Sequence, residues 1–149
     1  MRNRFFEYQL PVVLWLLLIF FLSTDAFSTV ETSRFIVPAL RFAFPTLSYE
    51  QIQSLHVVIR KLVHMMEYAI LAALAYRCLK NGQIDLADSR VKTIGFVLMA
   101  ALMDEWHQRF TALRGASIVD VGYDCLGGVW ALGVIGLYET WRLRSHSIL

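Results

Sequence analysis

Ionisable side chains occur at helical spacing in three separate stretches of this chain. In the first stretch Lys61, His64 and Tyr68 are three and four residues apart, so a helix would place them on one face. Glu67 would lie about 60° round from that face. An amine, an imidazole, a phenol and a carboxylate in one place can bind a charged ligand or transfer protons.

The second and third stretches are rich in carboxylates. Asp104, His107 and Gln108 would share one helix face. Asp120 and Asp124 are one helical turn apart and would share another. Side chains of these types could transfer protons near neutral pH or hold a divalent cation through mixed oxygen and nitrogen ligands.

The spacing identifies candidate residues without selecting one chemistry, because none of these patterns is a strong catalytic or metal-binding signature by itself. His64 or His107 could act in proton transfer. Arg109 and Arg114 could bind a phosphate or carboxylate group. The candidate ligands for a divalent cation are His64, Asp104, His107, Asp120 and Asp124.

Structural interpretations of the same residues remain open. Lys61 could lie at the membrane interface with its ammonium group in water. Glu105 and Arg109 could form an i,i+4 surface pair. A polar network that only holds helices together is the alternative for a larger group: Asp104, Gln108, Asp120 and Asp124.

The composition indicates that these polar residues belong to a membrane protein. The chain has 149 residues, of which 57% are hydrophobic and 17% charged, against roughly 45–50% and about 25% in soluble domains. This excess of apolar residues also excludes a disordered chain. The net charge of +2 is too small to indicate nucleic-acid binding. Cys78 and Cys125 do not form a disulfide framework and are predicted to be packing residues.

Four apolar runs predict an all-α integral membrane bundle of four transmembrane helices, at about residues 5–23, 58–79, 89–109 and 118–139. The first run could instead be a signal peptide, since Arg2 and Arg4 precede it. Between the first two spans, residues 39–44 predict a short element at the membrane interface, followed by a helix from about Ser48. The third helix is predicted to begin after Asp88 or Ser89.

The distribution of lysine and arginine predicts that both termini are cytoplasmic. Eight of these residues lie on the side of the termini and six on the other side. Tyr138 and Trp141 would mark the cytoplasmic interface and Trp106 the outer one. The three polar stretches, joined by Ser23 at the end of the first span, would then meet at the outer face. Ionisable residues inside a membrane are costly, so a site is the default hypothesis.

Two segments of the chain resemble the VanZ-like family. Residues 61–71 are similar to its K-x-x-H-x-x-E-Y-x-x-L segment, and residues 104–120 to its D-E-x-x-Q-x-F…R-x-x-S-x-x-D block. Leu22-Ser23-Thr24 also resembles the family's first span, which often ends in a pair of serines. Asp124 stands where the family usually has asparagine, which adds an ionisable group, and Gly127 matches the glycine that follows.

The resemblance implies a multi-span protein of the bacterial cytoplasmic membrane whose name-giving relative is associated with resistance to teicoplanin. We therefore expect a protein that acts on, or binds, a lipid-linked cell-wall precursor or a glycopeptide at the outer face, with membrane lipids as partners. The residues expected to act in catalysis are His64, Asp104, Glu105 and Asp120. The residues expected to bind the substrate are Lys61, Glu67, Tyr68, Gln108, Arg114 and Asp124.

Two other functions are compatible with this sequence. The protein could bind a lipid or an antibiotic without catalysis, or it could be a small proton-coupled transporter. A location near one end of the spans argues against transport, because transport sites usually lie near the midplane. Whether the protein is an enzyme, which cofactor it uses beyond a possible divalent cation, and its oligomeric state are all left open.

Overall fold

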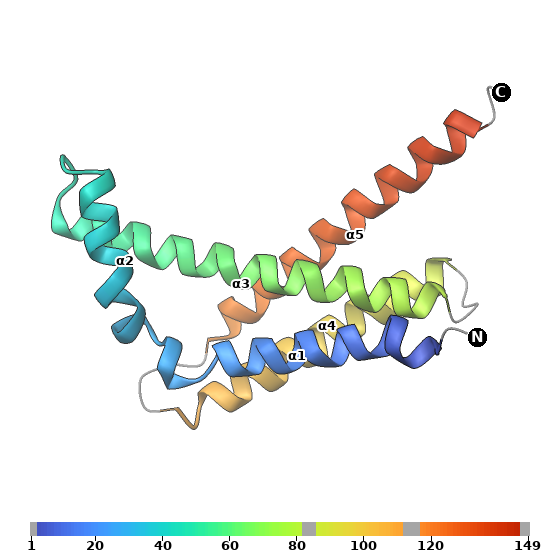
Figure 1. Cartoon of the computed structure of the whole chain (residues 1–149), viewed down its shortest axis with the longest axis horizontal. Helices are drawn as coiled ribbons and strands as arrows, with labels where there is room; N and C mark the ends of the chain where they lie inside the picture. Colours follow the sequence, from blue (N-terminus) through green and yellow to red (C-terminus); the bar gives the residue numbers. More distant parts are fainter. Residues whose placement is uncertain (1–2, 82–85, 112–116, 147–149) are drawn as a thin grey trace.

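The computed structural model describes residues 3–81, 86–111 and 117–146, and in these ranges the secondary structure is entirely helical (Figure 1). The elements in chain order are a π-helical turn η1 (Phe5–Gln9), α1 (Leu10–Leu22), a 3-10 turn η2 (Asp25–Phe27), α2 (Thr29–Ala43), α3 (Tyr49–Lys80), α4 (Leu86–Gln108) and α5 (Ile118–His146). The all-α prediction is confirmed.

Local sequence signals account for the start of α3. The Ser48 hydroxyl accepts a hydrogen bond from the backbone N–H of Gln51, and the Gln51 side chain accepts one from the N–H of Ser48. This reciprocal capping box satisfies two N–H groups that lack helical partners. The predicted start at Ser48 is therefore confirmed, and the helix continues without interruption into the second predicted span.

The predicted start of the third helix is wrong, because α4 begins earlier, at Leu86. Asp88 lies inside the first turn and pairs with Lys92, with 2.6 Å between the two charged atoms. Ser89 is buried, and its carbonyl oxygen accepts a hydrogen bond from the Thr93 hydroxyl. An acidic residue is favourable in a first helical turn as well as at the cap, so Asp88 did not mark the boundary.

The element between the first two predicted spans is longer than expected. Instead of a short stretch at residues 39–44, the structure has a 15-residue helix, α2, capped by Ser28 and containing Pro38. Its Phe35 and Phe42 side chains are 80% and 92% exposed. The helix contacts α3 through His56, whose ring lies 3.3 Å from the Thr32 hydroxyl.

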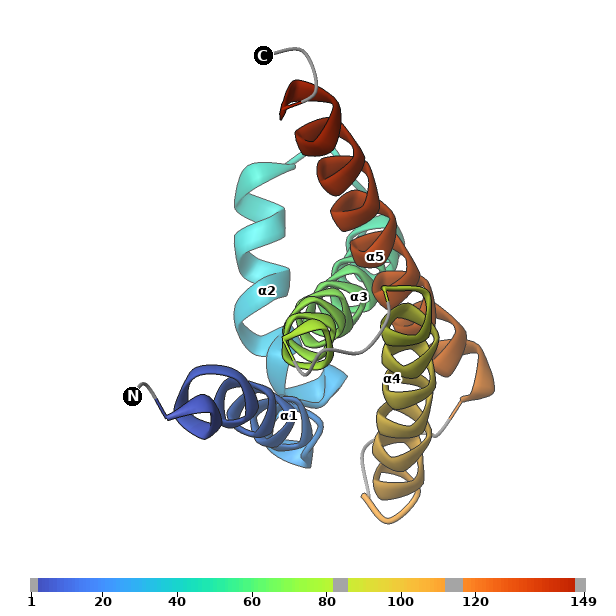
Figure 2. The same cartoon turned by 90° about the vertical axis from the view of Figure 1, so that its right-hand side faces the viewer.

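The long helix α3 lies at the centre of the molecule and contacts α1, α2, α4 and α5 (Figure 2). The core contains Tyr68, Leu71 and Ala72 from α3, together with residues from α1, α4 and α5: Ile19, Val97, Ala100, Ala101, Val121 and Ala131. The C-terminal end of α5 extends away from α1 and α4 (Figure 1). On α1, one side remains exposed, with the side chains of Val13, Leu14, Leu17, Leu18 and Phe21.

Glycine allows α5 to approach α3 closely. A Cβ atom on Gly127 would collide with the backbone carbonyl of Met65 in α3. A Cβ atom on Gly128 would lie 3.1 Å from a methyl group of Val97 in α4. The prediction that these glycines serve helix packing is confirmed.

Two helical segments are long and apolar enough to cross a membrane, namely Phe5–Leu22 and Ile118–Ser145. At ~1.5 Å per residue, α3 and α4 are also long enough, at about 48 and 35 Å. Because α3 and α4 carry many charged residues, the structure does not establish the four-span bundle, which stays a prediction.

Candidate functional site

The end of α1, the end of α4 and the start of α5 lie beside the middle of α3 (Figure 1). Polar and ionisable side chains from these four helices meet there, and several of them are buried. Asp104 and Asp124 are only 1% and 3% exposed, and Glu67 and Glu105 are also buried. We call this group the polar cluster: Ser23, Lys61, His64, Glu67, Tyr68, Asp104, Glu105, Gln108, Asp120 and Asp124. The predicted meeting of the three polar stretches and the end of the first span is thus observed in the structure.

Asp104 connects α4 to the end of α1. The Ser23 hydroxyl donates a hydrogen bond of 2.8 Å to Asp104 Oδ2, and the Gln108 side chain donates one of 2.9 Å to the same oxygen. A buried carboxylate needs such donors to offset its lost hydration. Ser23 and Gln108 therefore fix the position of the most deeply buried acid in the polar cluster.

His64 and Glu67 form a pair one turn apart on α3. His64 Nδ1 lies 3.2 Å from Glu67 Oε2. The indole N–H of Trp15 in α1 donates a hydrogen bond of 2.9 Å to the backbone oxygen of Glu67, which anchors this turn of α3 against α1. An imidazole beside a carboxylate can accept or donate a proton at a neighbouring ligand.

Lys61 and Asp120 connect α3 to the first turn of α5. The Lys61 ammonium group donates a hydrogen bond of 2.9 Å to Asp120 Oδ1 and lies 4.5 Å from the centre of the Tyr123 ring. Both charged side chains are partly exposed, so the pair adds little to stability on its own. Lys61 does not simply extend into water, as the interfacial interpretation assumed.

Glu105 holds the beginning of α5 against the end of α4. Its Oε2 atom accepts a hydrogen bond of 2.7 Å from the backbone N–H of Ser117, the residue before α5. Glu105 is buried, so the interpretation of Glu105 and Arg109 as a surface pair is wrong. Asp124 is near enough to His64 and Asp104 to interact with both electrostatically.

Tyr68 is fully buried on the same part of α3, and its hydroxyl has no hydrogen-bond partner among the described residues. The acidic groups of Asp104 and Asp124 are close enough to interact with it electrostatically. Buried hydroxyl groups in proteins are nearly always hydrogen-bonded. The Tyr68 hydroxyl is therefore suited to bind a water molecule or a polar group of a ligand.

A cavity of about 100 Å³ lies beside the polar cluster, between the end of α1, η2, α2 and α3. Its polar lining includes Arg60, His64 and Glu67, and its apolar lining includes Leu22, Phe27, Ile36, Ile59 and Val63. Arg60 is held in place by hydrogen bonds to the Phe27 carbonyl and the Thr32 hydroxyl, of 2.7 and 3.0 Å. A cavity with both kinds of lining suits a molecule that has a polar group on an apolar chain.

Two of the predicted site residues are not placed in the polar cluster. His107 lies edge-on to the Phe20 ring of α1, with 6.3 Å between ring centres. Arg114 lies outside the described residues. Within the described ranges, no three His, Cys, Asp or Glu side chains are arranged to hold a metal ion, so the five candidate cation ligands do not form such a group.

A second group of charges, at the other end of the bundle, was not predicted. Glu139 of α5 accepts hydrogen bonds from Tyr76 and Lys80 of α3 and from Arg90 of α4, at 3.1, 2.5 and 3.2 Å. The sequence carried one signal for this contact, because Glu139 is the last acidic residue and basic residues surround it in the predicted topology. Lys80 and Arg90 contributed to the predicted orientation of the chain, but their contact with Glu139 was not predicted.

The fold and the polar cluster define a class of protein: a helical bundle with two bilayer-length apolar segments, a largely apolar surface and buried ionisable residues at one end. A sequence model of the VanZ/LLP1 family matches residues 9–139, and the chain belongs to this family. The resemblance found in the motifs is confirmed. No curated protein and no solved structure matches the chain.

Proposed function

We propose that this protein is a four-span protein of the bacterial cytoplasmic membrane and that the polar cluster binds the headgroup of a membrane amphiphile at the outer face. The observation that supports this proposal best is the set of buried ionisable groups next to a cavity whose lining is mainly apolar with a few polar side chains. The expected ligands are a lipid-linked cell-wall precursor or a glycopeptide with a lipid tail. Binding of such a molecule would connect the protein to teicoplanin susceptibility.

The burial pattern of α4 supports a membrane-embedded bundle. Ser89, Thr93 and Asp104 are buried, whereas apolar residues of the same helix are exposed: Leu98, Met99, Leu102 and Met103. In water this arrangement would be unfavourable, since apolar surface would remain hydrated. In a bilayer the exposed residues contact lipid and the polar ones face the bundle interior.

Exposed aromatic residues support the proposed orientation. Trp106 lies near the polar cluster at the end of α4, and Tyr138 and Trp141 lie on the distal part of α5, all three exposed. Tryptophan and tyrosine are enriched at the two membrane interfaces. With both termini in the cytoplasm, the polar cluster is at the outer leaflet, where the exposed Phe35 and Phe42 of α2 also contact lipid.

The side chains of the polar cluster have distinct proposed roles. Lys61 binds an anionic group of the ligand, and the Tyr68 hydroxyl hydrogen-bonds to it. Arg114, which lies outside the described residues, is expected to bind an anionic group as well. Gln108 holds Asp104, as its hydrogen bond indicates. If the ligand is chemically changed, the proposed acid–base residues are His64, Asp104, Glu105 and Asp120. Of these, His64 is the best placed for proton transfer, because the Glu67 carboxylate lies beside its imidazole.

The test compares cells that express the wild type, Asp104→Asn or Asp88→Asn, by lipidomics and by teicoplanin susceptibility. Asp88 is the matched control because it is an exposed acid on the same helix. We expect the D104N cells to match cells lacking the protein and the D88N cells to match the wild type. Wild-type behaviour of D104N would refute the proposal.

A second variant covers the case in which D104N fails to insert into the membrane. Asp120 is partly exposed, so Asp120→Asn disturbs packing less than a change at Asp104. The purified protein is then incubated with extracted envelope lipids and analysed by mass spectrometry. Binding without a new product assigns the protein as a binder, and a product that D120N does not form assigns it as an enzyme. Solute flux driven by a pH gradient in proteoliposomes would instead indicate the transporter.

A further inference from the structure

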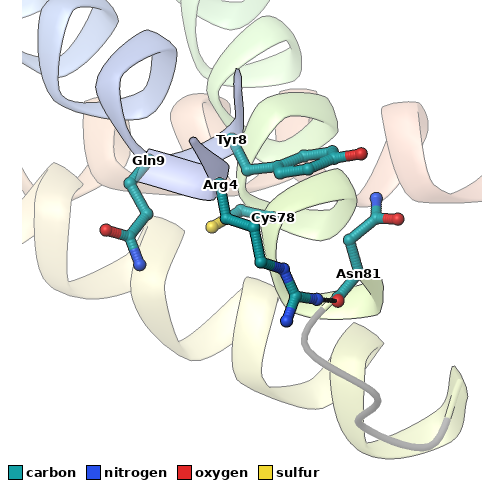
Figure 3. Close-up of a pocket in the computed structure, with 5 residues that line it drawn as sticks. All are labelled: Arg4, Tyr8, Gln9, Cys78 and Asn81. Atoms are coloured by element: carbon teal, nitrogen blue, oxygen red, sulfur yellow. Dashed lines mark hydrogen bonds between the residues drawn. The ribbon is translucent and has the colours of Figure 1, made fainter. Parts of the chain in front are cut away.

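A pocket of about 190 Å³ lies at the end of the bundle opposite the polar cluster. It is formed by η1 and the last turn of α3, and its lining consists of Arg4, Tyr8, Gln9, Cys78 and Asn81 (Figure 3). None of these five side chains is acidic. The positive charge of Arg4 is therefore not neutralised by another lining residue.

One arginine lines this pocket, and a second, Arg77, lies against Tyr8, which also lines it. One amino group of Arg4 donates a hydrogen bond to the carbonyl oxygen of Asn81, the residue that caps α3 (Figure 3). Arg77 lies over the ring of Tyr8, with its guanidinium carbon 5.2 Å from the ring centre. A guanidinium group has five N–H donors, so the Asn81 contact leaves Arg4 with donors for a further acceptor.

Exposed apolar side chains lie on the same N-terminal helical segment as this pocket. Phe5 and Phe6 of η1 are exposed, and so are Val13, Leu14 and Leu17 along α1. The first apolar segment, Phe5–Leu22, thus begins at the pocket and leads away from it. A molecule with a charged head and long hydrocarbon chains could place the head at Arg4 and the chains along α1.

The charge distribution along the chain favours an anionic head. Arg4 and Arg77 belong to the group of basic residues that the Lys and Arg count places on the cytoplasmic side. Lys80, close by in the last turn of α3, is already paired with Glu139. The inner leaflet is rich in anionic lipids, and basic pockets on this side of a bundle bind their phosphate groups.

We propose that the pocket between η1 and the end of α3 binds the phosphate group of an anionic phospholipid, with Arg4 as the main contact. This site is separate from the polar cluster and shares with it only the proposed membrane topology. Loss of lipid binding at Arg4 leaves the outer-face proposal intact. Conversely, variants of Asp104 are expected to keep this lipid.

The experiment measures lipid adducts by native mass spectrometry on the full chain, purified in detergent and mixed with equal amounts of phosphatidylglycerol and phosphatidylcholine. Both lipids carry a phosphate, but the quaternary ammonium group of phosphatidylcholine offsets its charge and is repelled by an arginine, so we expect the wild type to prefer phosphatidylglycerol by about tenfold. Arg4→Gln should lose this preference. Arg142→Gln should retain it, since Arg142 is exposed on α5 away from the pocket and the two variants have the same net charge.

Equal preferences in the R4Q and R142Q proteins would overturn the proposal, because the effect would then come from overall charge. Arg4→Lys keeps the charge and is expected to retain a preference, which guards against a misfolded R4Q protein. In a second arm, inorganic phosphate is added in excess. A lipid ligand should remain bound, since its chains contact α1, whereas displacement by phosphate would assign the pocket to free phosphate and reject the lipid.

Discussion

The contact between Gly127 and the backbone of α3 makes a quantitative prediction about helix packing. In Gly127→Ala the new methyl group meets the carbonyl of Met65, a backbone atom that cannot rotate away. Overpacking of this kind costs about 1–3 kcal/mol. Gly133 lies on the same helix with open space around its Cα, so Gly133→Ala adds the same methyl group without a collision.

The two alanine variants should therefore differ in opposite directions from the wild type. Alanine is a better helix former than glycine by up to about 1 kcal/mol, and in G133A no collision offsets this gain. Both variants gain the helix propensity of alanine, so their free energies of unfolding should differ by the cost of the collision, about 1–3 kcal/mol. For a chain of this size such a difference corresponds to a difference in Tm of roughly 2–12 °C.

The assay is thermal unfolding of both variants in the same detergent, followed by circular dichroism. Lysine accessibility to an amine-reactive reagent provides a second readout, because a displaced α5 would separate Asp120 from Lys61 and increase the labelling of Lys61. Equal stability of G127A and G133A would refute the close approach of α5 to α3. So would a large loss of stability in G133A.

Two further predictions concern other parts of the bundle. Burial and the nearby Arg60 lower the pKa of His56 below its usual value of 6.5. Below about pH 6.5 the unfolded chain binds a proton at His56 that the native state does not, so the free energy of unfolding should decrease as the pH is lowered. Hydrogen exchange of the α2 backbone should therefore speed up at low pH in the wild type, and His56→Asn should remove this pH dependence. Glu139→Gln should lower the Tm by weakening contacts with α3 and α4, whereas Glu50→Gln, on an exposed position of α3, should leave the Tm unchanged.

The polar cluster could be predicted because two simple rules act together. Helical spacing places His64 and Tyr68 on one face, and the alternating direction of the predicted spans brings the ends of α1 and α4 and the start of α5 to one side. Local capping also identified the start of α3 at Ser48. These features depend on neighbouring residues and on chain direction, which the sequence states directly.

Other contacts depend on geometry that spacing does not determine. His107 follows Asp104 on the same face, yet it contacts Phe20 because the position of α1 decides what that face meets. Glu139 meets Lys80 and Arg90 only because α5 crosses α3 and then passes the first turns of α4 before it extends away from the bundle. The length of α2 was missed because Pro38 usually ends a helix, whereas here the helix continues through it.

The crossing of α5 over α3 also has a mechanical consequence. Asp120 is two turns before the contact at Gly127 and Glu139 is more than three turns after it, or about 10 and 18 Å along the helix axis. With Gly127 as the fulcrum, α5 is a lever with unequal arms. A rotation that moves Asp120 away from Lys61 also moves Glu139, at the other end of the helix, nearly twice as far. The contacts of Glu139 with Lys80 and Arg90 resist this movement.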